Sequence, residues 1–352
     1  MGEGFGFGSA LSGPPAKGCE ICAKGAKMVL FITGVCSSGC YYCPVSDDRR
    51  GKKAVFADEM RIGRLEEMFA EAEAIGAEGT GITGGDPLED VGACVTAIRM
   101  LKDRYGKGHH IHLYTSTIDT DKAKALEEAG LDEIRFHPPV GLWKSMEKTQ
   151  LETIVRNSKM DVGIEVPALP GLEAELDALL DYAEDVGVRF VNINELEFSE
   201  GNWDMMAERG YEPADDCSAA VLGSLEMAIA AMEGHPGLPI HVCSSSFKDG
   251  AQLRNRLIRR AERVALGMDV VTEDGTILRG IAYPEDPEGA MASLIEGYGV
   301  PTELVRVAGG RLEAAAWVLE ELAAELPYRC YVVEEYPTAD RLEVERVPLN
   351  RR

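Results

Sequence analysis

Three cysteines near the N-terminus have a spacing that could hold an iron–sulfur cluster. Cys36, Cys40 and Cys43 stand in the run Cys-Ser-Ser-Gly-Cys-Tyr-Tyr-Cys-Pro. Three thiolates can bind three irons of a four-iron cubane and leave the fourth iron open to an external chelating group, whereas a fourth cysteine would close that position. The motif therefore predicts a [4Fe–4S] cluster with one open coordination position.

A second cysteine pair lies closer to the N-terminus. Cys19 and Cys22 form a C-x2-C pair, which is half of the ligand set that zinc or an auxiliary iron–sulfur cluster needs. Cys243 is the candidate that would complete this second metal site, with His241 and Cys217 as further ligands. Alternatively, Cys243 is a thiol that faces a substrate, or a buried cysteine with no chemical role.

The elements that must position these cysteines follow a repeating pattern. Short apolar runs alternate with longer amphipathic segments, and strands separated by helices need right-handed crossovers and a parallel sheet. The number of repeats predicts an α/β fold with a partial or full parallel (β/α) TIM-like barrel. We expect strands at residues 27–33, 79–84, 110–116, 133–137, 161–167, 190–198 and 239–244, and helices at 59–75 and after Asp90, Asp119 and Gly141.

The pattern changes near residue 266, where the parallel repeat ends. Asp274-Gly275 between two apolar runs predicts a hairpin, and two helical stretches and two further strands follow it. We therefore predict an N-terminal arm with the C-x2-C pair at residues 1–26, a βα barrel at 27–265, and a small α+β domain at 266–352.

Polar side chains stand where several of the expected strands end. In parallel barrels, the carboxyl ends of the strands and the loops after them build the active site. His137 would place an imidazole there as an acid or base, and His241 and Cys243 are further catalytic candidates. For any single residue, the alternative is a strand-end cap. The strand-end set is Gly84, Gly85, Asp86, Thr115, Ser116, His137, Glu165, Asn192, Asn194, Glu195, His241 and Cys243.

The cysteine spacing, the aromatic Tyr42 before the last cysteine and the position after the first strand together resemble the radical S-adenosylmethionine (SAM) superfamily. The run Thr-Gly84-Gly85-Asp86-Pro at the end of the next strand resembles the Gly-Gly-Glu-Pro element of that family, with an aspartate in place of the glutamate. The resemblance implies that this element receives the methionyl group of SAM. It also implies SAM contacts for Ser116, Glu165 and Asn194.

The resemblance implies a reductive radical enzyme in which the open iron binds SAM and an external donor, of the ferredoxin or flavodoxin type, supplies an electron. SAM is then cleaved to a 5′-deoxyadenosyl radical, which abstracts hydrogen from a substrate. Within the superfamily the chain looks most similar to an archaeal group related to glycyl-radical-enzyme (pyruvate formate-lyase) activating enzymes. Modification of RNA, modification of a protein partner and biosynthesis of a cofactor remain open outcomes.

Charge and composition restrict the partners of the protein. The 60 acidic and 36 basic residues give a net charge of -24, which disfavours nucleic acid and anionic membranes. The basic segment at residues 247–263 could bind phosphate or RNA, or it could pair with neighbouring carboxylates. No apolar run approaches the roughly 20 residues that span a bilayer, and residues 1–17 do not resemble a signal peptide, so we expect a cytoplasmic protein.

A different class of protein is compatible with the cysteines alone. Cysteine-rich loops bind zinc as readily as iron, and Cys19 and Cys22 could add ligands to such a site. The alternative function is therefore a non-catalytic zinc-binding interaction module.

Overall fold

Within residues 2–3 and 5–350, which the computed structural model describes, seven strands pair side by side in parallel. Each strand pairs with the next one along the chain, so the sheet curls steadily in one direction, as in a TIM barrel. Antiparallel strands flank its two edges, and the barrel is therefore partial. The parallel strands are β3 (Lys27–Phe31), β6 (Gly79–Thr83), β7 (His110–Thr115), β8 (Glu133–Phe136), β9 (Asp161–Ala168), β10 (Phe190–Glu195) and β11 (Ile240–Cys243).

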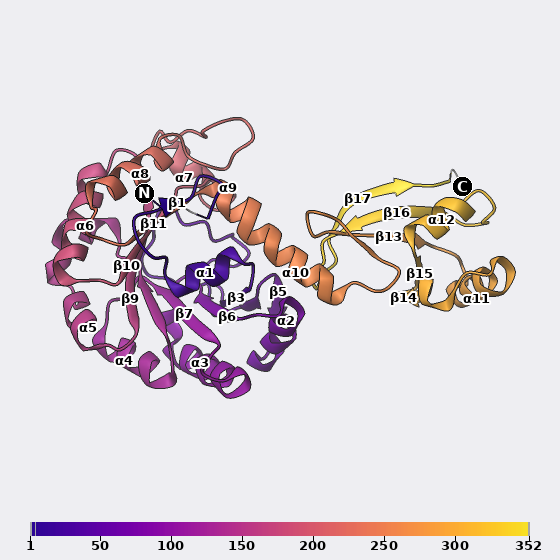
Figure 1. Ribbon diagram of the computed structural model, residues 1–352, viewed down its shortest axis with the longest axis horizontal. Coiled ribbons are helices and arrows are strands. Elements are labelled where there is room, and N and C mark those ends of the chain that lie inside the picture. The colour runs from indigo at the N-terminus through magenta and orange to yellow at the C-terminus, as the bar shows by residue number, and fades with distance from the viewer. Residues whose placement is uncertain (1, 4, 351–352) are drawn as a thin grey trace. The chain divides into compact units, whose positions relative to one another are not determined.

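Helices surround the outer face of this sheet (Figure 1). Two of them begin at aspartate caps, because the Asp90 and Asp119 carboxylates accept hydrogen bonds from the amides of Ala93 and Lys122. None of the helices in the described part of the chain is long and apolar enough to cross a membrane. The outer helices are α2 (Met68–Ile75), α3 (Val91–Tyr105), α4 (Thr120–Ala129), α5 (Leu151–Asn157), α6 (Glu173–Val186) and α8 (Ser224–Gly234).

The helix expected at residues 59–75 begins later than predicted. Its first part forms a hairpin of β4 (Val55–Ala57) and β5 (Met60–Ile62), and β4 pairs antiparallel with β3. Asp58, between the two strands, has a positive φ of 49°. The helical prediction was wrong here because pairing with an open sheet edge outweighs the local helical pattern.

The described part of the N-terminal arm joins the barrel. The strands β1 (Gly2–Glu3) and β2 (Ala10–Leu11) extend the sheet from β11, and α1 (Lys17–Ala23) contacts β3, β6 and β7. The amide of Gly18 donates to Glu133 Oε2 at 3.2 Å, at the first residue of β8. The helix α1 therefore closes the N-terminal end of the barrel, and it lies within the ring of strands in Figure 1.

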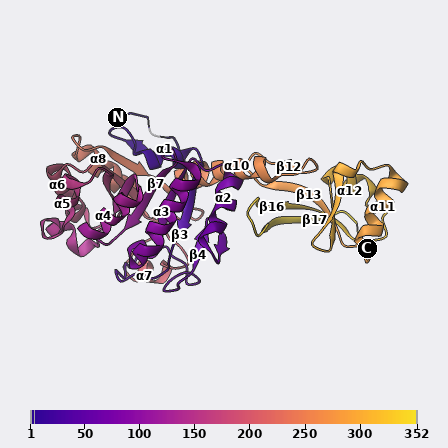
Figure 2. The same cartoon turned by 90° about the horizontal axis from the view of Figure 1, so that it is seen from below.

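The C-terminal part of the chain forms a second compact unit. Residues 74–76 and 254–352 belong to this unit, whereas residues 1–73 and 77–253 form the first. It contains α10 (Arg254–Val264), which the sequence assigned to the barrel, and an antiparallel sheet with α11 (Pro287–Tyr298) and α12 (Ala316–Leu322) against it (Figure 2). The sheet strands are β12 (Val270–Val271), β13 (Ile277–Ala282), β14 (Val305–Ala308), β15 (Arg311–Ala314), β16 (Cys330–Glu335) and β17 (Glu343–Pro348).

Two turns of this sheet contain glycines with positive φ angles. The predicted hairpin at Asp274-Gly275 joins β12 and β13, and Gly275 has a φ of 81°. A second hairpin, between β14 and β15, was not predicted. Its two-residue turn, Gly309-Gly310, has φ values of 58° and 74°, which match the type I′ turn that two-residue hairpins prefer.

The close approach of α1 to the barrel interior leads to a prediction about Gly18. A Cβ atom at Gly18 would lie 2.6 Å from the Arg135 guanidinium and 2.7 Å from His112 Nδ1. We expect Gly18→Ala to destabilise the protein by about 1–3 kcal/mol through overpacking, measured by chemical denaturation. Gly234→Ala is the control, because that helical position has open space around it; equal stability of the two variants would contradict the tight packing of α1.

Candidate active site

The three cysteines of the predicted cluster motif lie on the long loop between β3 and β4. Backbone hydrogen bonds from Gly34 N to Lys52 O and from Gly51 N to Gly34 O close the base of this loop at 2.8 and 2.7 Å. A Cβ atom at Gly34 would lie 1.7 Å from the Arg49 carbonyl oxygen, so only glycine lets these two backbone segments lie so close together. The loop is therefore a compact, closed segment.

The three thiols differ in their exposure. Cys36 is exposed, whereas Cys40 and Cys43 are half-buried, and all three are free. Burial raises the pKa of the Cys40 thiol, and the nearby Cys36 and Cys43 thiols raise it further. Within residues 2–3 and 5–350, no three His, Cys, Asp or Glu side chains already converge to hold a metal ion. Three soft thiolates in one short loop nevertheless have the donor chemistry of an iron–sulfur site, and metal binding commonly completes such geometry.

Tyr42 ties the cysteine loop to the interior of the barrel. The Tyr42 hydroxyl lies 3.1 Å from His137 Nε2, and His137 Nδ1 lies 2.8 Å from the Glu165 carbonyl oxygen. A carbonyl can only accept, so Nδ1 donates and Nε2 accepts from Tyr42. Burial lowers the pKa of His137. Its neutral ring, with both nitrogens bonded, orients Tyr42.

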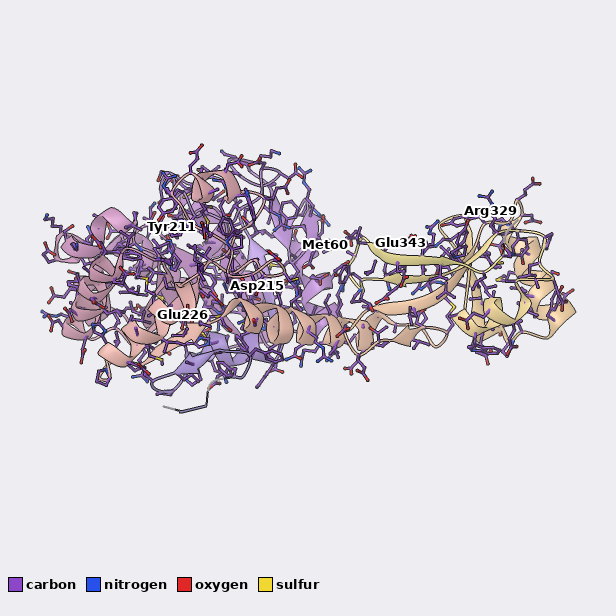
Figure 3. The ribbon with its side chains drawn as sticks, turned by 90° about the horizontal axis from the view of Figure 1, so that it is seen from above. Met60, Tyr211, Asp215, Glu226, Arg329 and Glu343 are labelled. Atoms are coloured by element: carbon purple, nitrogen blue, oxygen red, sulfur yellow. The ribbon has the colours of Figure 1, made fainter. Side chains whose placement is uncertain are left out.

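Two further segments hold the same loop. The Asn202 side-chain amide donates to the Tyr42 carbonyl at 3.0 Å, and Arg50, within the loop itself, donates to the Cys43 carbonyl at 3.1 Å and to the Gly201 carbonyl at 2.8 Å. The Tyr41 ring stacks on Tyr211, and their hydroxyls lie 2.9 Å apart. Tyr211, which is labelled in Figure 3, lies on the segment that precedes α8. The positions of the last two cysteines therefore depend on contacts distant in sequence.

The Gly-Gly-Asp run at the end of β6 packs directly on the start of the cysteine loop. Gly85 N and Asp86 N donate to the Thr33 and Val35 carbonyls at 2.7 and 2.8 Å. A Cβ atom at Gly85 would lie 2.6 Å from the Val35 carbonyl oxygen. These glycines are needed because two backbone segments touch here.

The Asp86 carboxylate binds residues at the end of β7 and directly after it, and it has little capacity left for a ligand. It accepts hydrogen bonds at 2.7 Å from the hydroxyls of Thr115, Ser116 and Thr117. The Ser38 hydroxyl, between the first two cysteines, donates to Ser116 at 2.7 Å. Asp86 and Ser116 therefore link the cysteine loop to β7.

Glu165 lies at the centre of a polar network in the barrel interior. It accepts hydrogen bonds from Arg135 Nη1 at 2.7 Å, Asn192 Nδ2 at 2.8 Å and Asn194 Nδ2 at 3.0 Å. Burial alone would raise the pKa of Glu165, but the Arg135 charge and the two amides outweigh this effect and lower it to about 2. Arg135 also binds Glu133 at 2.5 Å. The network thus spans β8, β9 and β10.

The second cysteine group faces the same interior. The Cys19 thiol lies 3.2 Å from Asn192 Nδ2 and 3.4 Å from Arg135 Nη2. Burial raises the pKa of Cys243 to about 12, so this residue is a thiol at neutral pH. One cavity is lined by Cys19, Cys22, Cys243 and His241. Cys217 is exposed on a different segment, between α7 (Trp203–Ala207) and α8.

Several residues of this interior were not predicted, although the sequence contains a signal for them. Side chains two apart on a strand point to the same face. Glu133 and Arg135, Asn192 and Asn194, and His241 and Cys243 have this spacing. In a barrel that face is the interior, so polar residues at alternate strand positions were the available signal. Arg135, Tyr114 and Lys27 are the additions that the structure makes, whereas Asn192 was among the predicted strand-end residues.

Comparison with known proteins gives matches to two family models and an extensive similarity to a curated protein. A model described as the radical SAM superfamily matches residues 30–138, and a domain of unknown function (DUF8061) matches residues 275–349. The chain is 39% identical over 351 residues to a protein of Methanocaldococcus jannaschii named "Putative glycyl-radical enzyme activating enzyme", covering 95% of this chain and 92% of the relative.

Solved structures with similar parts were also found. Methylornithine synthase (PylB) is 14% identical with a TM-score of 0.42, and the match covers 61% of this chain and 63% of that chain, which is less than two thirds. HydG, a maturase of the [FeFe]-hydrogenase, is 15% identical with a TM-score of 0.38, and the match covers 72% of this chain and 70% of that chain.

The low pKa of Glu165 leads to a prediction about pH. A folded-state pKa of about 2, below the ordinary 4.5, means that the ionised carboxylate stabilises the native state above pH 4.5 and that this contribution disappears as the pH falls toward 2. Glu165→Gln should therefore lower the free energy of unfolding at pH 7 by roughly 3 kcal/mol.

The measurement is chemical denaturation of wild type and variant at pH 7 and at about pH 3, where their difference should shrink. Glu128→Gln, at a side chain that is 65% exposed, is the matched control and should change little at either pH. A difference that does not depend on pH would contradict the assigned charge state.

Proposed function

The chain belongs to the radical SAM superfamily and is an enzyme of that class, and we propose that Cys36, Cys40 and Cys43 hold a [4Fe–4S] cluster at which it reductively cleaves SAM. The observation that carries this proposal is the closed loop of three free thiols against the Gly84-Gly85-Asp86 turn. When bound, the cluster and SAM supply a 5′-deoxyadenosyl radical that abstracts hydrogen from a substrate.

The residues of this chain would position and enclose that chemistry. Tyr42 and His137 orient the cysteine loop. Asp86 orients Ser116 by accepting a hydrogen bond from the Ser116 hydroxyl. Because both Asp86 oxygens already accept hydrogen bonds, we assign Asp86 a positioning role and propose that the glycine backbone of this turn receives the methionyl group. We propose that Ser116, Asn194 and Glu165 contact the remainder of SAM.

The barrel interior would accept the substrate. The helix α1 covers its N-terminal end, and shielding from water is what a reactive primary radical requires. We propose Cys243, a buried neutral thiol, as a hydrogen-atom donor, and His241 lies two residues before it on β11. An external ferredoxin- or flavodoxin-type donor would supply the electron. The nine free thiols support assignment to the reducing cytoplasm.

The role of the cysteine loop is tested by SAM cleavage. Anaerobically purified protein, reduced with dithionite, should convert SAM to 5′-deoxyadenosine, measured by chromatography. Cys40→Ala should reduce this activity to the level without protein, because three thiolates are needed to hold the cubane. Cys217→Ala is the control and should retain activity, since this exposed cysteine lies on another segment. Purified protein that contains zinc without iron would contradict the proposal.

A second metal site on Cys19 and Cys22 stays a prediction, and metal content tests it. The Cys19 thiol contacts the Arg135 guanidinium, a charge that opposes a metal cation. We therefore expect about four irons per chain and no zinc, as one cubane contains. The double variant Cys19→Ala and Cys22→Ala should leave that count unchanged. About eight irons, reduced to about four in the variant, would instead establish an auxiliary cluster.

A further inference from the structure

The N-terminal arm packs beside the cavity that Cys19, Cys22, His241 and Cys243 line, which we call the thiol cavity. The strand β2 of this arm pairs antiparallel with β11, at the edge of the parallel strands. Residues 5–9, which precede β2, therefore lie beside the C-terminal end of β11, where Cys243 stands.

The Phe5 ring packs between the arm, α1 and the residues after β11. It stacks on the Phe247 ring at a centroid distance of 5.3 Å and meets the His241 ring edge-on at 5.4 Å. Two clusters of buried residues pack against Phe5, and they are Ala16, Cys19 and Phe190, and Cys243, Phe247 and Ala251. Cys19 and Cys243 are only 5% and 7% exposed, and both belong to the clusters that Phe5 covers.

Two polar contacts tie the same segment to the cavity wall. The Ser9 hydroxyl lies 3.0 Å from His241 Nε2, and the Ser244 hydroxyl donates to the Phe7 carbonyl at 2.6 Å. One contact is at the end of the segment and the other is at its turn. The segment is therefore held against β11 and the residue that follows it.

The turn of this segment has a backbone conformation that favours opening. Gly6, Phe7 and Gly8 have φ values of 88°, 52° and 78°. A bulky residue with a positive φ is strained, and such strain persists only where the surrounding contacts enforce it. The strands β1 and β2 have two residues each, so few backbone contacts oppose local opening of the arm.

We propose that residues 5–9 form a strap that opens and closes over the thiol cavity, with the Phe5 ring as its seal. In the closed state the strap keeps solvent from Cys19 and Cys243 on this side of the barrel, and in the open state these thiols can be reached. The role of this closure rests on the proposed function, because a thiol that reacts with a radical must be shielded from water.

Alkylation of the thiols tests the strap and does not depend on SAM cleavage. Anaerobic, iron-loaded protein is treated with iodoacetamide, and modification of each cysteine is followed over time by mass spectrometry of its peptide. We expect Cys19 and Cys243 to react much more slowly than the exposed Cys217, which is the internal reference. Equal rates for all three in the wild type would overturn the proposal.

A substitution in the turn tests opening without removing a contact. Gly6→Ala should speed the reaction of Cys19 and Cys243 about tenfold, because alanine is strained in this left-handed conformation. The added Cβ atom meets no described atom within 4 Å. Gly234→Ala is the control, since that helical glycine also has open space around it, and its rates should equal those of the wild type.

A second pair of variants tests the seal. Phe5→Ala should accelerate the reaction of both buried thiols about tenfold or more, because the packing of a large ring is lost. Phe7→Ala is the matched control in the same turn, because its side chain is 56% exposed, and it should react as the wild type does. If Phe5→Ala does not fold, as judged by circular dichroism, Phe5→Leu is measured in its place and should give a smaller acceleration.

Unchanged rates in both Gly6→Ala and the Phe5 variant would overturn the strap. Acceleration by the Phe5 variant alone would make Phe5 a fixed core residue and would also refute opening, and equal acceleration by Phe7→Ala would refute the seal. The outcome is separable from that of SAM cleavage. Cleavage with unchanged alkylation rates would refute only this inference, whereas the expected rates in a protein that does not cleave SAM would refute only the proposed function.

Discussion

Arg135 places a permanent positive charge inside the barrel, and the neighbouring side chains are arranged around it. Its guanidinium binds Glu133 on its own strand and Glu165 on the next, and it contacts the Cys19 thiol of α1. Breaking a buried pair leaves an uncompensated charge and costs several kcal/mol. The relative positions of α1, β8 and β9 are therefore fixed by electrostatics as well as by packing.

Glu165 connects this charged centre to the cysteine loop. Its carboxylate belongs to the Arg135 network, whereas its backbone carbonyl accepts a hydrogen bond from His137, which in turn accepts one from Tyr42. One residue of β9 thus contributes to the interior and to the loop at the barrel mouth. Movement of β9 would therefore disturb both.

The charges outside and inside the barrel are balanced differently. The net charge of -24 repels polyanions such as RNA at a distance. In the interior, Arg135 and Lys248 are paired with Glu133, Glu165 and Glu197, and Lys27 supplies a third cation. These three cations and three carboxylates cancel.

The sequence by itself determined the order of the strands and helices, the parallel sheet and the cysteine loop, because these depend on short-range periodicity and on spacing within one segment. It also identified Glu165, Asn194, His137 and Cys243 as strand-end residues. Only the tertiary structure decided what these side chains contact, since Arg135, Lys27 and α1 reach them from distant segments. The tertiary structure also decided that residues 60–62 form a strand, because an open sheet edge supplies hydrogen bonds that the local sequence cannot reveal.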